Sequence, residues 1–247
     1  MFNIEILILI TLIFLFAGFV KGVSGIGLPA ISLSLLTLFM GLKFAVALVV
    51  VPGLMTNIWQ AFGQYKINKI LFRMWPLILS MFCFSIIGAS LLVKFSEGLT
   101  ILLGCLLILY GFISILMRIQ YFIPLRYEKI FGFITGMLGG FFGGSTGTFV
   151  FPTALYVYSL NINKEEFLQT IAVVLISASF CLGFSLTVTS LWSFTLASYS
   201  LYAVIPSFIG MYFGRKVQSI IKEEIFRKIF LIMIILVGLL IIFRSSY

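Results

Sequence analysis

The residue whose chemistry is most conspicuous is Lys21, a cation in a glycine run inside otherwise apolar sequence. This first glycine run, GFVKGVSGIGLP, spans residues 18–29. Glycine-rich backbone frees N–H and C=O groups, which at membrane depth survive only beside protein or water. A charge at that depth is costly unless it has a partner, so we interpret Lys21 as facing a small anion. The alternative is that its ammonium group extends to the membrane surface.

A second glycine run, GFITGMLGGFFGGSTG, spans residues 132–147. It repeats part of the first run at one constant spacing: Gly18, Phe19, Gly22 and Gly25 match Gly132, Phe133, Gly136 and Gly139. Hydrophobic segments interrupted at matching places in two halves indicate the binding site of a transporter. The alternative is that the glycines only let helices pack closely, as small residues at four-residue spacing do in membranes.

Each glycine run is expected to lead into a new helix whose N-terminus points into the membrane. Pro29 suits the first turn of one such helix, and Ser145 and Thr146 are candidate N-caps of its counterpart. Unpaired N–H groups and the positive end of the helix dipole make an anion site. We expect the two helix ends to converge near the midplane of the bilayer.

Polar side chains on two other membrane segments are further candidate ligands of the anion. Residues 45–62 supply Thr56, Asn57 and Gln60, and the counterpart segment 167–179 supplies Gln169 and Thr170. Hydrogen bonds between helices are the alternative role for such residues. The candidate binding residues are Lys21, Gly22, Ser24, Gly25, Gly27, Thr56, Asn57, Gln60, Gly139, Gly140, Gly143, Gly144, Ser145, Thr146, Gln169 and Thr170.

Several kinds of chemistry are disfavoured by residues that the chain lacks. It has no histidine and no aspartate, and its seven glutamates fall at predicted span ends. A proton relay in the membrane, a general base for hydrolysis and a metal site all lack their usual side chains. Cys83, Cys105 and Cys181 fall in the middle of separate spans, as buried apolar residues do. We therefore expect no catalysis, no cofactor and no metal.

The composition is that of a polytopic membrane protein. Of the 247 residues 62% are hydrophobic and 9% charged, and the mean hydropathy is +1.24, whereas about a quarter of residues in soluble proteins are charged. The net charge of +9 resides in short loops, where basic residues set membrane orientation. We therefore expect a lipid bilayer and a small anion as partners, a second copy of the chain as an option, and no nucleic acid.

The apolar spans and their charged loops suggest a topology. After residues 4–20, spans are predicted at 28–41, 44–62, 74–93, 99–117, 148–160, 167–190, 192–213 and 225–243. The spans that follow the glycine runs are too short to cross about 30 Å of hydrocarbon alone, so each broken unit is either a single kinked crossing or a hairpin. The loop charges indicate two halves of opposite orientation, which requires an even number of crossings in the broken unit and therefore favours the hairpin. Basic loops at 66–73, 118–129 and 215–228 are expected in the cytoplasm and both termini outside.

This scheme predicts an all-α polytopic membrane protein with two inverted-topology repeats. Each repeat is a glycine-broken helix hairpin followed by three transmembrane helices. The first membrane repeat covers residues 1–120 and the second covers 121–247, within one integral membrane domain. Inverted repeats around a midplane site are typical of secondary transporters.

The two glycine runs, together with AVALVVVPGLMTNIWQAF at residues 45–62, resemble the sulfite exporter TauE/SafE family of bacterial inner-membrane proteins. The resemblance covers nearly the whole chain. Matching motif positions are Gly18, Lys21, Gly22, Gly25, Gly27, Gly136, Gly139, Gly140, Gly143 and Gly144. The chain departs from the family where Leu28 and Pro29 replace a longer glycine run, and where extra residues precede Pro152.

The resemblance implies a permease of about eight hydrophobic segments that exports sulfite, sulfonates or related anions. Together with the motifs, it leads us to expect a multi-pass secondary transporter, an exporter of a small anion, that works by alternating access. An anion channel of the same architecture is the alternative. The exact anion, the direction of transport and the coupling ion remain open at this point.

Overall fold

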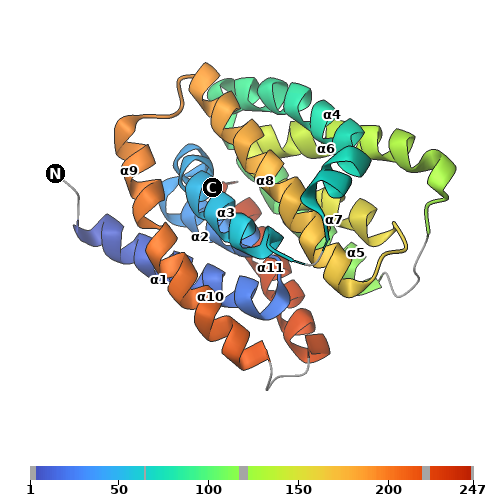
Figure 1. Cartoon of the computed structure of the whole chain (residues 1–247). Coiled ribbons are helices and arrows are strands. Elements are labelled where there is room, and N and C mark those ends of the chain that lie inside the picture. Colours follow the sequence, from blue (N-terminus) through green and yellow to red (C-terminus); the bar gives the residue numbers. More distant parts are fainter. Residues whose placement is uncertain (1–3, 64, 117–121, 219–222, 246–247) are drawn as a thin grey trace. The chain divides into compact units, whose positions relative to one another are not determined.

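The computed structural model describes residues 4–63, 65–116, 122–218 and 223–245, and this part of the chain is helical without any strand (Figure 1). The helices are α1 (Ile4–Ser24), α2 (Leu28–Met40), α3 (Leu42–Ala61), α4 (Ile67–Lys94), α5 (Ser96–Leu116), α6 (Glu128–Thr146), α7 (Val150–Tyr158), α8 (Lys164–Val188), α9 (Phe194–Tyr202), α10 (Val204–Gln218) and α11 (Glu223–Ser245). A short 3₁₀ turn, η1 (Leu125–Tyr127), precedes α6.

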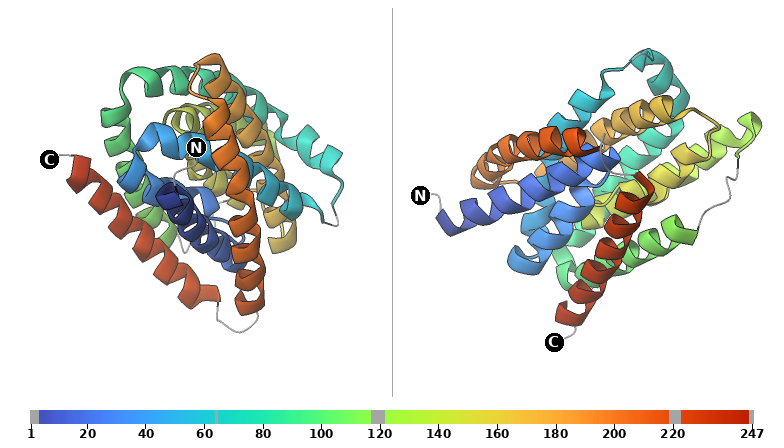
Figure 2. Two further views of the ribbon diagram at one scale, coloured as in Figure 1. Left: turned by 90° about the vertical axis from the view of Figure 1, so that its left-hand side faces the viewer. Right: turned by 90° about the horizontal axis from the view of Figure 1, so that it is seen from below.

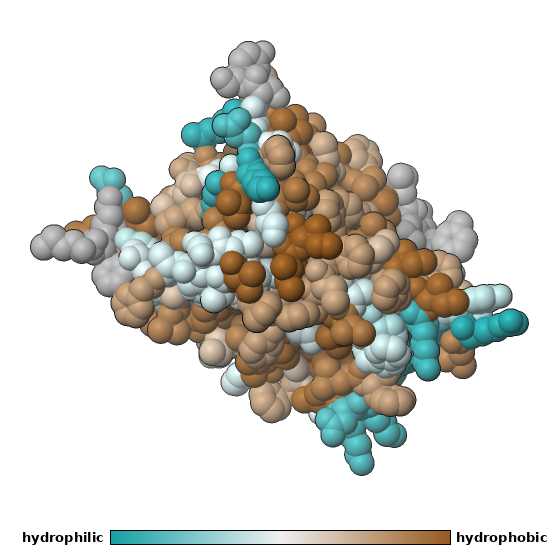
Figure 3. All heavy atoms as spheres, turned by 90° about the horizontal axis from the view of Figure 1, so that it is seen from above, coloured by the Kyte–Doolittle hydropathy of each residue, from teal (hydrophilic) through white to brown (hydrophobic). Residues whose placement is uncertain are grey.

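Seven stretches in the described ranges are long and apolar enough to cross a membrane. They are α1, α3, α4, α5, α8, the pair α9 and α10 taken together, and residues 228–245 of α11. Apolar residues also cover most of the face shown in Figure 3, with hydrophilic clusters at its margins. The prediction of an all-α polytopic membrane protein is confirmed. Residues 118–121 and 219–222 of the predicted basic loops lie outside the described residues.

The chain divides into two compact units that combine segments from both predicted halves. Unit 1 consists of Met1–Pro52, Ser96–Leu116 and Trp192–Tyr247, and unit 2 of Gly53–Phe95 and Met117–Leu191. In unit 1, α1 packs on α10 and α5 on α11, while in unit 2 α4 packs on both α6 and α8. Compact packing therefore does not follow the predicted division at residue 120, because each glycine-rich helix has its main partner in the other half of the sequence.

In unit 1, α1 and α10 run side by side in the same direction (Figure 2). A Cβ on Gly18 would overlap the carbonyl oxygen of Ser207, and one on Gly22 would overlap that of Met211. Across the crossing, Gly210 and Gly214 lie equally close to the backbone of α1. The glycines are needed here because the two backbones leave no room for a side chain, as in other membrane helix pairs with small residues at four-residue spacing.

Unit 2 contains an equivalent crossing between α4 and α6. A Cβ on Gly140 would overlap the carbonyl oxygen of Met81, and one on Gly144 would overlap that of Ser85. In return, Gly88 of α4 lies against the backbone of α6. These helices also run parallel, because contacts advance along both chains together. The same packing solution therefore occurs once in each unit.

The glycine runs are helical over most of their length, which corrects the prediction that they form long breaks. α1 continues through Gly18 and Gly22 to Ser24, and α6 continues from Glu128 to Thr146. The first break is limited to residues 25–27 and the second to residues 147–149. Close packing, the alternative that the sequence left open, therefore accounts for most of these glycines.

The breaks themselves require glycine for backbone reasons. Gly25 and Gly27 have φ of 76° and 116°, and Gly147 has φ of 78°, values that other residues adopt only with strain. Both breaks have a left-handed residue directly after the helix, as is common at helix C-termini. Their backbone conformation redirects the chain into α2 and α7.

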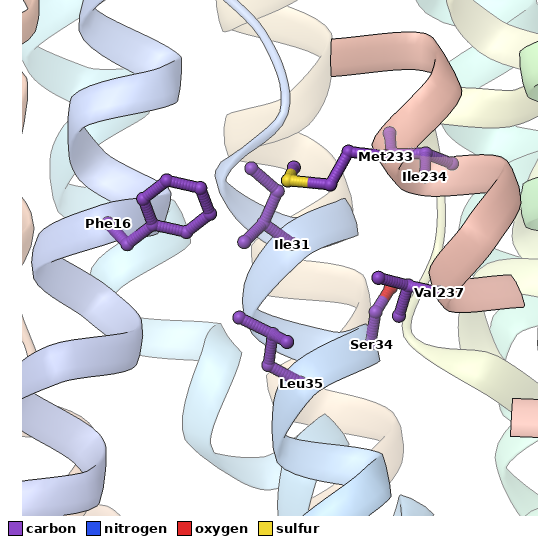
Figure 4. A pocket seen from close by; sticks show the side chains of 7 residues that line it. All are labelled: Phe16, Ile31, Ser34, Leu35, Met233, Ile234 and Val237. Atoms are coloured by element: carbon purple, nitrogen blue, oxygen red, sulfur yellow. The ribbon is translucent and has the colours of Figure 1, made fainter. Parts of the chain in front are cut away.

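Both broken segments fold back as hairpins, as the loop charges predicted. In unit 1, Phe16 of α1 lines a small apolar pocket with Ile31 and Leu35 of α2, on the two sides of the break (Figure 4). In unit 2, the Tyr156 hydroxyl of α7 donates a hydrogen bond of 3.0 Å to the carbonyl of Glu128 at the start of α6. Neither contact could form across a single continuous crossing.

The contacts also bear on the alignment of the two glycine runs. The pairs Gly18–Ser207 and Gly22–Met211 of unit 1 have counterparts in Gly140–Met81 and Gly144–Ser85 of unit 2. By its packing partner, Gly18 resembles Gly140, which lies about two helical turns beyond Gly132. The sequence match does not choose between the two spacings, because glycines recur every four residues.

Candidate functional site

Lys21 lies in the last turn of α1, directly before the first break. Its side chain is buried, with 3% of its surface exposed. The carbonyl of Lys21 accepts a hydrogen bond of 2.8 Å from the N–H of Gly25, which closes the helix. The prediction that Lys21 lies at the tip of the hairpin is therefore off by about one helical turn, while its burial is confirmed.

A second cation, Arg215 of α10, lies near Lys21. The close approach of the two helices brings the backbone nitrogen of Arg215 to 3.0 Å from where a Cβ of Gly22 would be. Its positive charge is near enough to act on the ammonium group of Lys21. Since like charges repel, the two side chains together favour an anion near the first break. No sequence signal connects these residues, because they are far apart along the chain.

The α2 helix begins at this break without a side-chain cap. Gly27 occupies the N-cap position, and Pro29 lies in the first turn, as predicted. The Ser24 hydroxyl donates to the local carbonyl of Val20 at 2.9 Å or to that of Ile26. With Ser24 occupied by its own backbone, the free N–H groups of the α2 N-terminus keep their capacity to bind an anion.

The second break is built differently from the prediction. Ser145 and Thr146 are the last residues of α6 and do not cap α7, whose N-cap position is occupied by Phe149. The Thr146 hydroxyl donates to the carbonyl of Phe142 at 2.7 Å and accepts from the N–H of Thr148 at 3.4 Å. The N-cap prediction was wrong because α6 extends further than expected, and these hydroxyls serve its C-terminal turn instead.

The four glycines that were predicted near the second break face two different helices. Gly140 and Gly144 contact the backbone of α4, as described above. Gly139 faces the hydroxyl oxygen of Thr153 in α7, and Gly143 lies under the ring of Phe149. Gly140 and Gly144 thus hold the helix crossing, whereas Gly139 and Gly143 border the break.

The glutamines of α3 and α8 form a hydrogen-bonded link within unit 2. The Gln169 amide group donates to the carbonyls of Ala61 (3.0 Å) and Tyr65 (2.8 Å), and its oxygen accepts from the N–H of Tyr65 (3.0 Å). Gln60 donates to the carbonyl of Leu168 at 3.2 Å. These groups therefore fasten the end of α3 and the following loop to α8, which is the alternative that the sequence left open.

The remaining candidates on these helices are buried in the same region. Thr56 donates to the carbonyl of Gly53 at 3.3 Å. Asn57 and Thr170 are 2% and 4% exposed. The candidate residues thus form two groups: Lys21, Gly22, Ser24, Gly25 and Gly27 in unit 1, and the others in unit 2.

A charged network near the start of α4 and α6 was not predicted from the sequence. Arg73 donates to both carboxylate oxygens of Glu128, at 2.9 and 2.6 Å, and its third nitrogen lies 3.8 Å from Glu166. The side chain of Glu128 is only 9% exposed. The only hint in the sequence was that each residue begins an apolar span, which does not identify a pair 55 residues apart.

Comparison with known proteins identifies one relationship. A family model described as Sulfite exporter TauE/SafE matches residues 10–241, nearly the whole chain. No curated protein and no solved structure matches the chain. The matched region includes both breaks and both helix crossings.

Proposed function

The chain belongs to the sulfite exporter TauE/SafE family of membrane transporters, and we propose that it exports a small anion, sulfite or an organosulfonate, across the bacterial inner membrane. The proposed mechanism is secondary transport by alternating access. The family match supports the transport of a sulfur oxyanion, and the structure suggests how its charge is bound.

The observation that carries this proposal is the burial of Lys21 in the last turn of α1, near Arg215 and shortly before the first break. Lys21, Arg215 and the uncapped start of α2 offer positive potential in one region of unit 1. Positive potential in a buried region stabilises an anion that binds there.

The proposal of inverted repeats is supported by the contacts within each unit. In unit 1, α5 and α11 are antiparallel, and they cross at Gly104 and Gly238. A Cβ on Gly104 would lie 2.8 Å from the carbonyl oxygen of Gly238, and one on Gly238 would lie 2.9 Å from that of Gly104. Such a reciprocal contact is what a two-fold axis between equivalent helices produces.

Anion flux into proteoliposomes tests the proposed function. We expect Lys21→Met to abolish sulfite flux while the protein remains folded, because methionine fills similar volume without charge. Lys94→Met is the matched control, since Lys94 is exposed at the end of α4. Wild-type flux in the Lys21 variant would exclude this residue from the mechanism.

The same preparation separates a transporter from an anion channel. Alternating access predicts flux that saturates with sulfite concentration and is accelerated by anion on the opposite side of the membrane. Flux that rises linearly and shows no exchange would instead support the channel. Failure of sulfite, sulfate and methanesulfonate to cross at all would refute anion transport for this panel.

A further inference from the structure

Two hydroxyl groups at the second break are buried without a hydrogen-bond partner. In the described part of the chain three buried side-chain oxygens have none, and they belong to Thr37, Thr148 and Thr153. Thr148 lies within the second break and Thr153 in the following turn of α7. They are 4% and 0% exposed. Two of the three oxygens therefore occur within six residues of each other, beside a helix break.

Two groups near these hydroxyls are already hydrogen-bonded or lack a side chain. The Thr146 hydroxyl is already bonded to the backbone of Phe142 and Thr148. The position opposite Thr153 is Gly139, which has no side chain, and a Cβ there would lie 3.0 Å from the Thr153 hydroxyl oxygen. The α6–α7 hairpin thus contains two buried hydroxyl groups, those of Thr148 and Thr153, that have no hydrogen-bond partner.

Leaving a buried hydroxyl without a partner is destabilising, because it loses its bonds to water and gains none in the protein. Valine has nearly the same shape as threonine and would avoid that loss. Two such hydroxyls beside one break therefore indicate a partner that binds there during the working cycle.

We propose that Thr148 and Thr153 donate hydrogen bonds to oxygen atoms of the transported anion. This inference rests on the proposed function. Sulfite and sulfonates present three oxygens, each able to accept such bonds. Since both hydroxyls are buried in this structure, the anion binds them in a state in which the hairpin has opened.

The first break differs from the second in a way that fits this assignment. When Gly25 is matched with Gly147, the position of Thr148 corresponds to Ile26, that of Thr153 to Ile31, and that of Lys21 to Gly143. The first break therefore offers a cation where the second has glycine, and the second offers hydroxyls where the first has isoleucine.

Thermal unfolding of the purified full-length protein with and without sulfite or methanesulfonate tests the inference, because a ligand of the native state raises its apparent stability. We expect Thr153→Val, and separately Thr148→Val, to need about tenfold more anion for the same stabilisation. Without anion these variants should unfold at the wild-type temperature or above it, since a costly hydroxyl has been removed. Thr153→Ser should retain most of the wild-type response.

Thr187→Val is the matched control, because the Thr187 hydroxyl is bonded to the carbonyl of Gly183 at 2.8 Å and should have no role in binding. Wild-type anion affinity in both valine variants, with Lys21→Met still unresponsive, would overturn this inference and leave the proposed function intact. Absence of any anion response or flux in the wild-type protein would overturn both. A valine variant that unfolds at a lower temperature with unchanged anion affinity would indicate a structural role and also overturn the inference.

Discussion

Replacement of Gly18 by alanine is the sharpest test of the helix crossing in unit 1. The added methyl group would overlap the carbonyl oxygen of Ser207, with the carbonyl carbon and Cα of that residue at 2.9 and 3.0 Å. All three atoms belong to the backbone, so no rotamer change can make room. The crossing must widen along its length, where Gly22, Gly210 and Gly214 are also in close contact.

The magnitude follows from two opposing effects. Overpacking a well-packed interface costs about 1–3 kcal/mol, and rigid backbone neighbours put this case at the upper end, about 2–3 kcal/mol. Alanine in place of glycine inside a helix returns up to about 1 kcal/mol. We therefore expect Gly18→Ala to lower the free energy of unfolding by about 1–3 kcal/mol.

Equilibrium unfolding in detergent micelles measures this change. Gly98→Ala is the control, because Gly98 also lies in a helix, α5, and a Cβ there would meet nothing within 4 Å. It should be neutral or stabilising by up to about 1 kcal/mol. If Gly18→Ala were as stable as Gly98→Ala, the close approach of α1 and α10 would be refuted.

Two further predictions concern the charged network and the first break. Arg73→Met should lower the free energy of unfolding by about 1–3 kcal/mol, because it leaves the buried carboxylate of Glu128 without its charged partner. Combining it with Glu128→Gln should recover part of the loss. Additive effects of the two substitutions in this double-mutant cycle would argue against the pair. Gly27→Ala should destabilise the protein more than Gly41→Ala. Both positions have positive φ, but only at Gly27 would a Cβ collide with another side chain. Equal unfolding midpoints for the two variants would contradict that collision.

Sequence alone determined the class of the protein and much of its architecture. Continuous apolar spans of sufficient length can be stable only in a bilayer, so the all-α membrane fold follows from composition and period. The short spans after the glycine runs allowed a kinked crossing or a hairpin, because about 20 Å of helix cannot cross the hydrocarbon alone, and the loop charges predicted the hairpin. The isolated lysine predicted a buried cation, since its neighbours on both sides are apolar. The family match then agrees with the motifs that indicated it.

Tertiary structure decided what the glycines do and which residues share a site. The motif Gly-x-x-x-Gly fits both a broken helix and a close helix crossing, and only the backbone of α10 beside Gly18 and Gly22 distinguishes them. The neighbours of Lys21 and Glu128 are likewise set by contacts between distant segments, in Arg215 and Arg73. A hydroxyl's bonding state also depends on every surrounding atom, so the unpartnered Thr153 could not be recognised from its place in the sequence. Period and composition are local properties of the chain, whereas packing distances and hydrogen-bond partners exist only after the helices have assembled.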